Sequence, residues 1–308
     1  MYYPYIRGTQ NELLALQGCA GEIAAGGKVV PVIEPLESPV GRLARTVEQL
    51  SAASVPFILI VNPQAGELRA APRPLENLID GGRSLFPRGY ALGYIISQAT
   101  TVRDVQAFLN KHADERVAFV HLHDFDDVPR LNALVDGHGG LSHHIFVEWF
   151  TGSLYQGMFA EYPRILIRDG VKKRRNADYP PDEFFSELHR TYADLGWDGF
   201  GDFTTVGDNF DAGYRPPAVA IHLTYRSDGA DIRVKHFLSR KTEVPEPLGV
   251  QVQEALSKLV KYLKTHPMPF SAACRRFLEL SREAPPPGLG VIKRVSIMHH
   301  LELMNNIL

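Results

Sequence analysis

The run Val117-Ala118-Phe119-Val120-His121-Leu122-His123 is short, almost wholly apolar, and ends on polar residues. Seven other runs have the same form and occupy residues 29–34, 57–62, 91–97, 145–148, 165–169, 199–204 and 218–224. Near-continuous apolar runs of this length are typical of parallel strands that are buried on both faces. Helical spacing of apolar residues between most successive runs therefore predicts an α/β protein of the (β/α)8, TIM-barrel-like type.

We expect a helix before the first of these strands. Thr9 and Glu12 have the spacing of a capping box, and Leu13, Leu16 and Ile23 then recur at helical intervals. Helical patterns are also present at 75–85, 102–111, 128–135, 182–195 and 250–266. With the strands between them, these segments predict a single barrel domain over residues 1–284, which includes the N-terminal helix.

Two additions to the barrel are expected near the C-terminus. Turn-forming residues around Asp228 and Gly229 predict that the last strand continues into an antiparallel hairpin, which would place His222 opposite His236. Three prolines at 285–287 then separate a final helix from the domain. We expect residues 285–308 to form this joint and a helix that packs on the barrel or on a protein partner.

The composition is that of a globular protein with a large core. Of the 308 residues, 44% are hydrophobic and 22% charged, and the formal net charge is −2, which argues against attraction of nucleic acid over the whole surface. The two cysteines, Cys19 and Cys274, form no metal-binding motif. The first residues lack the apolar core of a signal peptide, and no run approaches the about 20 apolar residues of a membrane helix. We therefore expect a cytoplasmic protein that does not contact the membrane.

Polar and ionisable residues stand at the ends of the predicted strands. The carboxyl ends of barrel strands meet at one mouth, where the active sites of such enzymes lie. We therefore expect one site there, in which carboxylates and histidines exchange protons or bind metal. The candidate catalytic residues are Glu34, Glu148, Asp169, Asp202, His222 and His236, and Asn62 is a candidate for substrate binding.

His121 and His123 are candidate ligands of a divalent metal ion. Alternation along a strand puts both rings on one face, and a carboxylate from a neighbouring strand would supply a third ligand. The other interpretation is that these histidines are hydrogen-bonded within the core. The sequence does not decide whether a cofactor is present.

A basic segment follows the sixth predicted strand. Arg168 ends the strand, and Lys172, Lys173, Arg174 and Arg175 come directly after it. Four adjacent cations are not buried without partners, so we expect this basic loop to be exposed. It would hold a phosphate-bearing substrate or a nucleic-acid strand, with Arg168 placed for a bidentate contact, or it is a solvated loop.

The opening residues carry a family resemblance. Residues 3–16 (YPYIRGTQNELLAL), followed by Val30-Pro31-Val32-Ile33-Glu34, resemble the uncharacterised bacterial and phage "beta protein" family. Segments at 176–179, 199–202, 221–225, 236–239 and 299–300 look like motifs of a closely related bacterial branch. The resemblance implies a barrel-like fold and a setting among mobile or phage-defence genes, but it implies no reaction.

Two functions are consistent with these features. The first is a hydrolase or phosphodiesterase that acts on an anionic substrate at the mouth of the barrel. The second is a non-catalytic barrel that serves as a sensor or scaffold in a defence module and contacts protein or nucleic acid through the basic loop and the terminal helix.

Overall fold

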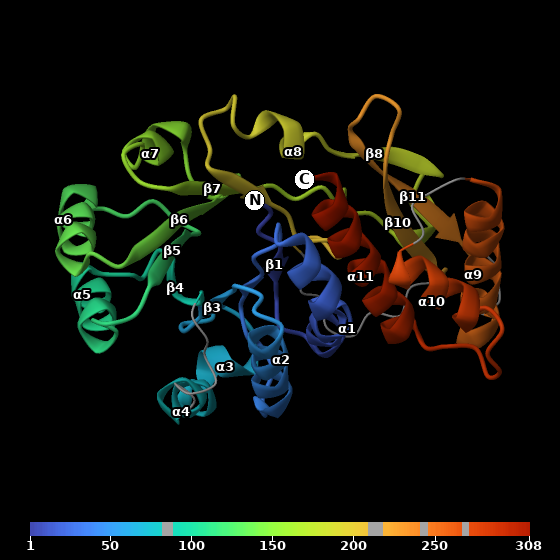
Figure 1. Ribbon diagram of the computed structural model, residues 1–308, viewed down its shortest axis with the longest axis horizontal. Helices are drawn as coiled ribbons and strands as arrows, with labels where there is room; N and C mark the ends of the chain where they lie inside the picture. The colour runs from blue at the N-terminus through green and yellow to red at the C-terminus, as the bar shows by residue number, and fades with distance from the viewer. Residues whose placement is uncertain (82–88, 209–217, 241–245, 267–270) are drawn as a thin grey trace.

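Eight parallel strands form the barrel, in the order β1-β2-β3-β4-β5-β6-β7-β9. The computed structural model describes residues 1–81, 89–208, 218–240, 246–266 and 271–308 (Figure 1). The barrel strands are β1 (Tyr5–Ile6), β2 (Val32–Ile33), β3 (Ile58–Ile60), β4 (Ala91–Ile96), β5 (Val117–His121), β6 (Leu141–Val147), β7 (Arg164–Ile167) and β9 (Gly199–Gly201). This arrangement confirms the predicted α/β barrel class.

Backbone contacts between the N-terminal segment and β9 close the barrel. The amide of Tyr3 donates to the Phe200 carbonyl at 2.7 Å, and the amide of Tyr5 donates to the Asp202 carbonyl at 2.8 Å. On its other side, Pro4 accepts a hydrogen bond from Val32 at 2.9 Å. The first strand is therefore bonded on both sides, although it begins at the very start of the chain.

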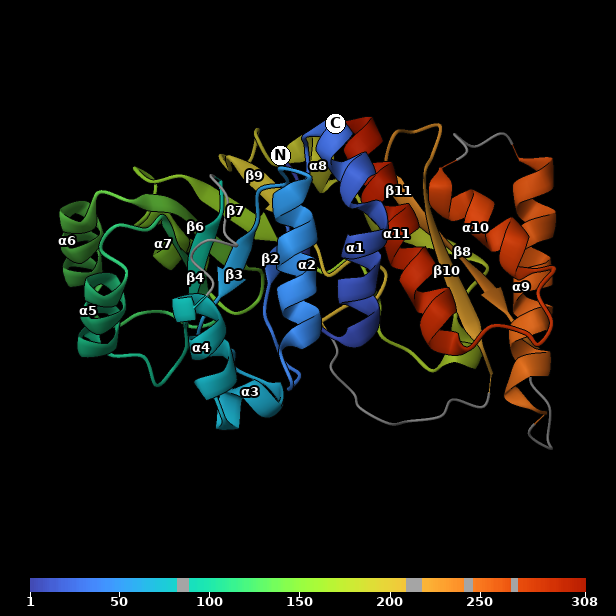
Figure 2. The ribbon, with the colours of Figure 1, turned by 60° about the horizontal axis from the view of Figure 1, so that its bottom comes forward.

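Helices cover the barrel between its strands, as Figures 1 and 2 show for the first six crossovers. They are α1 (Gln10–Gly26), α2 (Gly41–Ala52), α3 (Gly66–Ala70), α4 (Arg73–Gly81), α5 (Val102–Lys111), α6 (Val128–His138) and α7 (Ser153–Gly157). The capping box predicted at the start of α1 is confirmed, because Thr9 and Glu12 bond one another's backbone. Residues 82–85 of the helix predicted over 75–85 lie outside the described part of the chain.

A second, antiparallel sheet stands beside the barrel, in the order β10-β11-β8. Its strands are β8 (Asp182–Ser186), β10 (Ala220–Arg226) and β11 (Ile232–Leu238), and the remaining elements are η2 (Asn176–Asp178), α8 (Leu188–Thr191), α9 (Leu248–Thr265), α10 (Ala272–Leu280) and α11 (Leu289–Ile307). Figure 2 shows α11 between α1 and α10, so this last helix connects the barrel to the second sheet. None of the described helices combines the length and apolar character that crossing a membrane requires.

Three expectations about individual elements are wrong. The N-terminal helix does not precede the first strand, because β1 comes before it. Residues 218–224 do not form the eighth barrel strand, since β10 pairs with β11 and not with β9. The helix expected over 182–195 is instead the strand β8 followed by the short α8. The hairpin itself is confirmed, with His222 paired to His236.

Side chains of the barrel strands alternate between two cores, and this alternation decides where the strand-end residues point. Val32, Val120 and Ile167 fill the barrel interior. Phe119 and Phe146 instead pack in the layer between the sheet and the helices. A strand-end residue two positions after an inward-facing side chain also faces inward, toward the mouth. A residue directly after an inward-facing side chain faces the helices instead.

Candidate functional site

The mouth of the barrel is occupied by an ion-paired arginine. Arg7 Nη1 lies 3.2 Å from Glu34 Oε2, and Arg7 also pairs with Asp208. Its guanidinium lies over the rings of Tyr5 and Phe203, at 5.7 and 5.5 Å from their centroids. Glu34 is buried and also accepts a hydrogen bond from the Tyr5 hydroxyl at 2.7 Å. These contacts join the residue after β1 to the residue after β2 at the mouth of the barrel.

Asn62, at the end of β3, is bonded to the neighbouring strand. Its amide nitrogen donates to the Ile95 carbonyl at 3.0 Å, and its oxygen accepts from the Ile95 amide at 2.7 Å. The side chain therefore replaces a backbone partner and continues the ladder between β3 and β4. Both of its amide atoms are used for this structural purpose.

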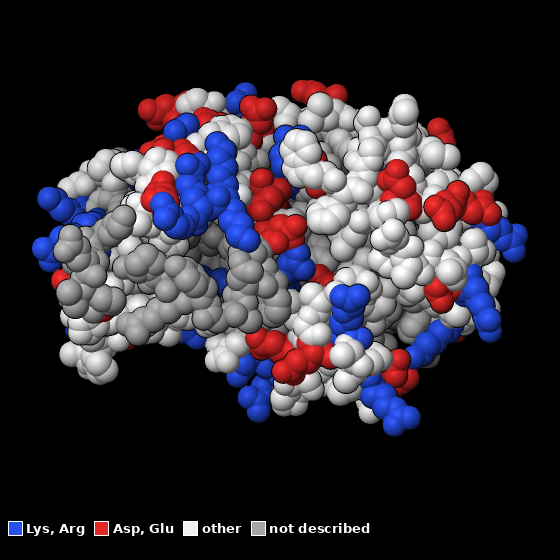
Figure 3. Space-filling model, turned by 180° about the vertical axis from the view of Figure 1, so that it is seen from behind, with Lys and Arg blue, Asp and Glu red and all other residues white. Residues whose placement is uncertain are grey.

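A cleft of about 830 Å³ lies where the barrel rim meets the second sheet and the start of α11. We call it the rim cleft. Four basic residues and two carboxylates line it, together with one histidine: Lys173, Arg174, Arg175, Lys293, Asp169, Asp208 and His222. Seen from behind, the molecule carries a group of neighbouring Lys and Arg side chains beside Asp and Glu side chains (Figure 3). The rim cleft thus combines positive charge with groups that can exchange protons.

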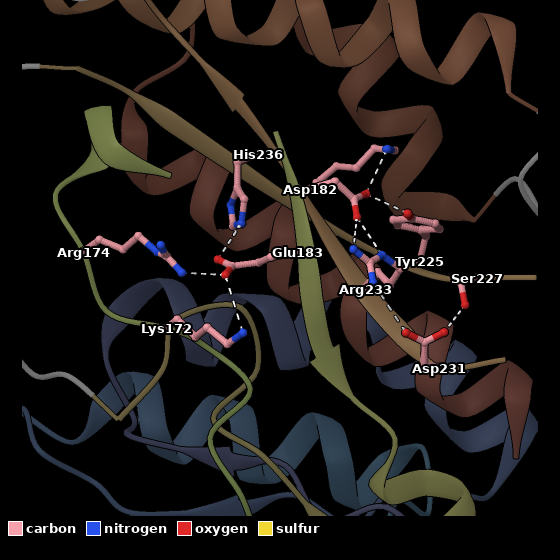
Figure 4. Close-up of polar contacts among 10 residues, drawn as sticks. Lys172, Arg174, Asp182, Glu183, Tyr225, Ser227, Asp231, Arg233 and His236 are labelled. Atoms are coloured by element: carbon pink, nitrogen blue, oxygen red, sulfur yellow. Dashed lines mark hydrogen bonds and ion pairs between the residues drawn. The ribbon is translucent and has the colours of Figure 1, made fainter. Parts of the chain in front are cut away.

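The basic loop is exposed, as the sequence predicts, and part of its charge is paired. Arg174 donates to Glu183 of β8 at 2.6 Å, and Lys172 lies 3.9 Å from the same carboxylate. Arg175 pairs with Asp178 at 2.6 Å. The two contacts to Glu183, which Figure 4 shows, join the loop to the second sheet beside the cleft.

Asp169 is the half-buried acid of the rim cleft. Its two oxygens accept hydrogen bonds from the amides of Val171 and Asp208, both at 2.8 Å. Burial raises the pKa of this carboxyl above its usual value, and the nearby carboxylates of Asp202 and Asp208 act in the same direction. The two amide donors oppose the shift without cancelling it. A carboxyl with a raised pKa is suited to proton transfer.

His222 reaches the rim cleft from the hairpin and touches His236. The two Nδ1 atoms are 2.6 Å apart, and His236 Nε2 lies 3.1 Å from Glu183 Oε1. Burial, followed by the neighbouring His236, lowers the pKa of His222 to about 3. Burial is also the main cause that lowers the pKa of His236 to about 4, so both rings are neutral near pH 7.

Glu148 and Arg168 lie in a different hollow. Both follow inward-facing residues and therefore point toward the helices, where Arg168 binds Glu148 through two hydrogen bonds of 2.8 Å. They line an outer groove of about 680 Å³ that also includes Trp149, Phe150 and Leu195. Arg168 thus makes its bidentate contact with Glu148 and does not border the rim cleft.

His121, His123 and Asp202 do not meet at the mouth either. Both ring nitrogens of His121 are used in the outer layer, by Tyr155 at 2.8 Å and by His144 at 2.9 Å. His123 is exposed, because β5 ends at His121 and the alternation stops there. Within the described part of the chain, no group of three or more His, Cys, Asp or Glu residues is arranged to hold a metal ion.

Asp202 joins the barrel to the last helix. It accepts a hydrogen bond from the Tyr2 hydroxyl at 2.6 Å and lies 3.3 Å from His300 Nε2. His300 in turn contacts Thr224 of β10 at 2.9 Å. All four side chains are buried, so this network connects the barrel, the second sheet and α11.

The structure therefore does not bring the expected site residues together in one place. Asp169, His222 and three cations of the basic loop line the rim cleft, whereas Glu34 and Asn62 belong to the mouth. The sequence analysis missed Arg7, Glu183, Asp208 and Lys293. Lys293 lies on α11 and lines the same cleft as the basic loop, from which it is more than 100 positions away in the sequence. No local sequence pattern links Lys293 to that loop.

Comparisons with known proteins add little. No protein-family model and no curated protein matches the chain. Among solved structures, the chain is similar to a mandelate racemase/muconate lactonizing protein from Herpetosiphon aurantiacus, with 13% identity and a TM-score of 0.38. The match covers 76% of this chain and 60% of that structure's chain. A likeness at this level carries no argument about function.

Proposed function

We propose that the protein is a hydrolase that binds a phosphate-bearing anion in the rim cleft. The single observation that carries this proposal is the composition of the cleft, where four basic side chains surround the half-buried Asp169 and the neutral His222. The two kinds of group have separate uses. The cations attract and orient the anion, and the ionisable groups move protons.

The cations come from two separate segments that both line the cleft. Lys173, Arg174 and Arg175 belong to the loop after β7, and Lys293 belongs to the first turns of α11. Arginine binds phosphate oxygens in a bidentate manner, and lysine acts as a point charge. A ligand held between the loop and α11 would have its negative charge neutralised by both segments.

Asp169 is the group that we assign to proton transfer to the leaving group. Hydrolysis of a phosphodiester forms a bond from phosphorus to a water oxygen and breaks the bond to the leaving oxygen. One proton leaves the water and another must reach the departing oxygen. A carboxyl whose pKa is raised keeps its proton to a higher pH and can donate it in this step.

The test is turnover of diphenyl phosphate, whose basic phenolate leaving group needs a proton, by the wild-type protein and by Asp169→Asn. We expect wild-type turnover and a loss of at least about 100-fold in kcat for the variant, with the affinity for pyrophosphate changed less than threefold. Asp124→Asn, in the outer groove, is the matched control and should retain kcat. A folded wild-type protein that releases no phenol would refute the proposal.

The second candidate is a non-catalytic sensor or scaffold, and one observation favours it. Large apolar side chains are exposed around the outer groove, with Trp149 87% and Leu154 91% accessible. Exposed apolar patches commonly mark protein-binding surfaces. A wild-type protein that binds pyrophosphate but hydrolyses no diester would favour this candidate. The phage-defence setting, which comes from the family resemblance, is likewise a proposal.

A further inference from the structure

Three side chains of the second sheet form a continuous chain that leads into the rim cleft. Glu183 of β8 contacts His236 of β11 at 3.1 Å, and His236 contacts His222 of β10 at 2.6 Å. The far end of this chain is anchored, because Glu183 also binds Arg174 at 2.6 Å and lies 3.9 Å from Lys172 (Figure 4). The near end, His222, lines the cleft.

The positions of the protons follow from the identities of the partners. Glu183 accepts a hydrogen bond from Arg174 and faces His236 Nε2 with its other oxygen, so the proton of the neutral His236 lies on Nε2 and points to Glu183. His236 Nδ1 is then an acceptor, and His222 must donate to it from Nδ1. Since His222 is neutral as well, its Nε2 carries a lone pair and no proton.

The lone pair of His222 Nε2 is the open end of the chain. Among the described residues, Nε2 has no hydrogen-bond partner, whereas Nδ1 is bonded to His236. The ring is held by the edge of the Tyr179 ring, at a centroid distance of 4.9 Å, and the same tyrosine stacks on His236 at 4.5 Å. The orientation of both imidazoles is therefore fixed by packing as well as by hydrogen bonds.

We propose that His222, His236 and Glu183 form a proton relay, in which His222 Nε2 takes a proton from the water that attacks the bound phosphate ester. This inference rests on the hydrolase proposed above and names the base that accompanies Asp169. His222 is the catalytic residue, because it meets the reacting water. His236 and Glu183 are positioning residues that act through it.

The protons balance along the relay. When water gives a proton to His222 Nε2, the proton on His222 Nδ1 passes to His236 Nδ1. The proton on His236 Nε2 passes in turn to Glu183 Oε1. Both imidazoles remain neutral, each in its other tautomer. The transferred proton ends on Glu183, which becomes a neutral carboxyl group beside Arg174. The relay thus removes the need to hold an imidazolium in a site where burial disfavours it.

The resting tautomers can be measured without any activity. We expect ¹⁵N NMR spectra of the wild-type protein at pH 7.5 to show His222 protonated on Nδ1 and His236 protonated on Nε2. Glu183→Gln checks the assignment, because it should shift the His236 signals more than the His222 signals. The opposite pattern, with His222 protonated on Nε2, would overturn the relay, because that nitrogen would then have no lone pair.

Kinetics test the function of the relay. With bis(4-nitrophenyl) phosphate, Glu183→Gln and His222→Gln should each lower kcat by at least about 100-fold, with KM within threefold of wild type. The matched control is Asp182→Asn, the adjacent residue on the other face of β8, which binds Tyr225, Arg233 and Lys235 instead. It should retain kcat per folded molecule, and the thermal midpoint of each variant identifies any unfolded fraction.

The outcomes separate the two proposals. If the wild-type protein turns over the diester and Glu183→Gln keeps kcat within twofold, the relay is overturned and the hydrolase stands. If the wild-type protein is inactive and His222 is protonated on Nδ1, the hydrolase fails, the relay loses its catalytic role, and only the predicted tautomers survive. Loss of kcat in Asp182→Asn equal to that in Glu183→Gln would assign the effect to the sheet as a whole and overturn the relay.

Discussion

Gly201 of β9 lies directly against the main chain of Tyr3, at the point where the barrel closes. A Cβ atom on Gly201 would stand 1.9 Å from the Tyr3 carbonyl oxygen and 2.6 Å from the Ile167 side chain. Neither neighbour has room to move, because the Tyr3 backbone is bonded to Phe200 and Ile167 belongs to the packed interior. Only glycine fits at this contact between the first and last strands.

Gly201→Ala should therefore destabilise the protein by about 3 kcal/mol, since overpacking at a rigid position forces the backbone apart. Urea unfolding measures the change. Gly21→Ala is the control, because a Cβ there meets nothing within 4 Å on the exposed side of α1. That substitution should stabilise by about 0.5–1 kcal/mol through helix propensity. Equal effects of the two would contradict this account of barrel closure.

The arginine in the mouth should be important for stability. Arg7→Met keeps an unbranched apolar stem but leaves the buried Glu34 without its cation, and we expect a loss of about 3 kcal/mol in the free energy of unfolding. The exposed pair of Lys111 and Asp80 provides the comparison. Lys111→Met should cost less than about 1 kcal/mol. An equally small loss for Arg7→Met would show that the mouth does not depend on this pair.

Stability should fall as the pH drops below 6.5. Burial is the main cause that lowers the pKa of His144 to about 3, whereas the unfolded chain takes up this proton near pH 6.5. The neutral ring therefore contributes fully above pH 6.5, and its contribution declines as the pH falls toward 3, by about 1.4 kcal/mol per unit for one histidine. His121, which is bonded to it, is shifted in the same direction.

His144→Gln tests this dependence between pH 6.5 and 5, where most carboxylates do not yet titrate. The variant should be less stable than wild type at pH 7.5, because His121 loses a partner. On acidification, its free energy of unfolding should also fall less steeply than that of the wild type, by about 1 kcal/mol per pH unit. A wild-type slope that is unchanged in the variant would mean that His144 is not held neutral in the fold.

The barrel class could be predicted because seven of its strands are apolar runs separated by helices. The first strand could not, because it is short and part of its bonds come from the β9 segment, almost 200 positions away. The run at 218–224 was assigned to the barrel because the small apolar residues Ala218 and Ala220 make it look apolar throughout. Its large apolar residues in fact occur at every second position. Val219, Ile221 and Leu223 face α9 and α10, as in a sheet covered on one side.

The site was harder to predict than the fold. The direction of a strand-end side chain reverses with each residue, so Asp169 reaches the cleft while Arg168 points to the outer layer. Asp182 and Glu183 begin the segment 182–195, for which the sequence predicts a helix. They lie instead on opposite faces of β8, each held by cations from other segments. Such partners become visible only once the chain is folded.

The central claim is that the rim cleft binds phosphate-bearing anions, and its most direct test is the affinity for pyrophosphate measured by calorimetry. Lys173→Ala/Lys293→Ala removes one cation from each of the two segments that line the cleft. Loss of two charge-assisted contacts predicts that Kd rises at least about tenfold. The control, Arg130→Ala/Lys261→Ala, removes two exposed cations elsewhere and should leave Kd unchanged. Equal affinity in both double variants would contradict the account.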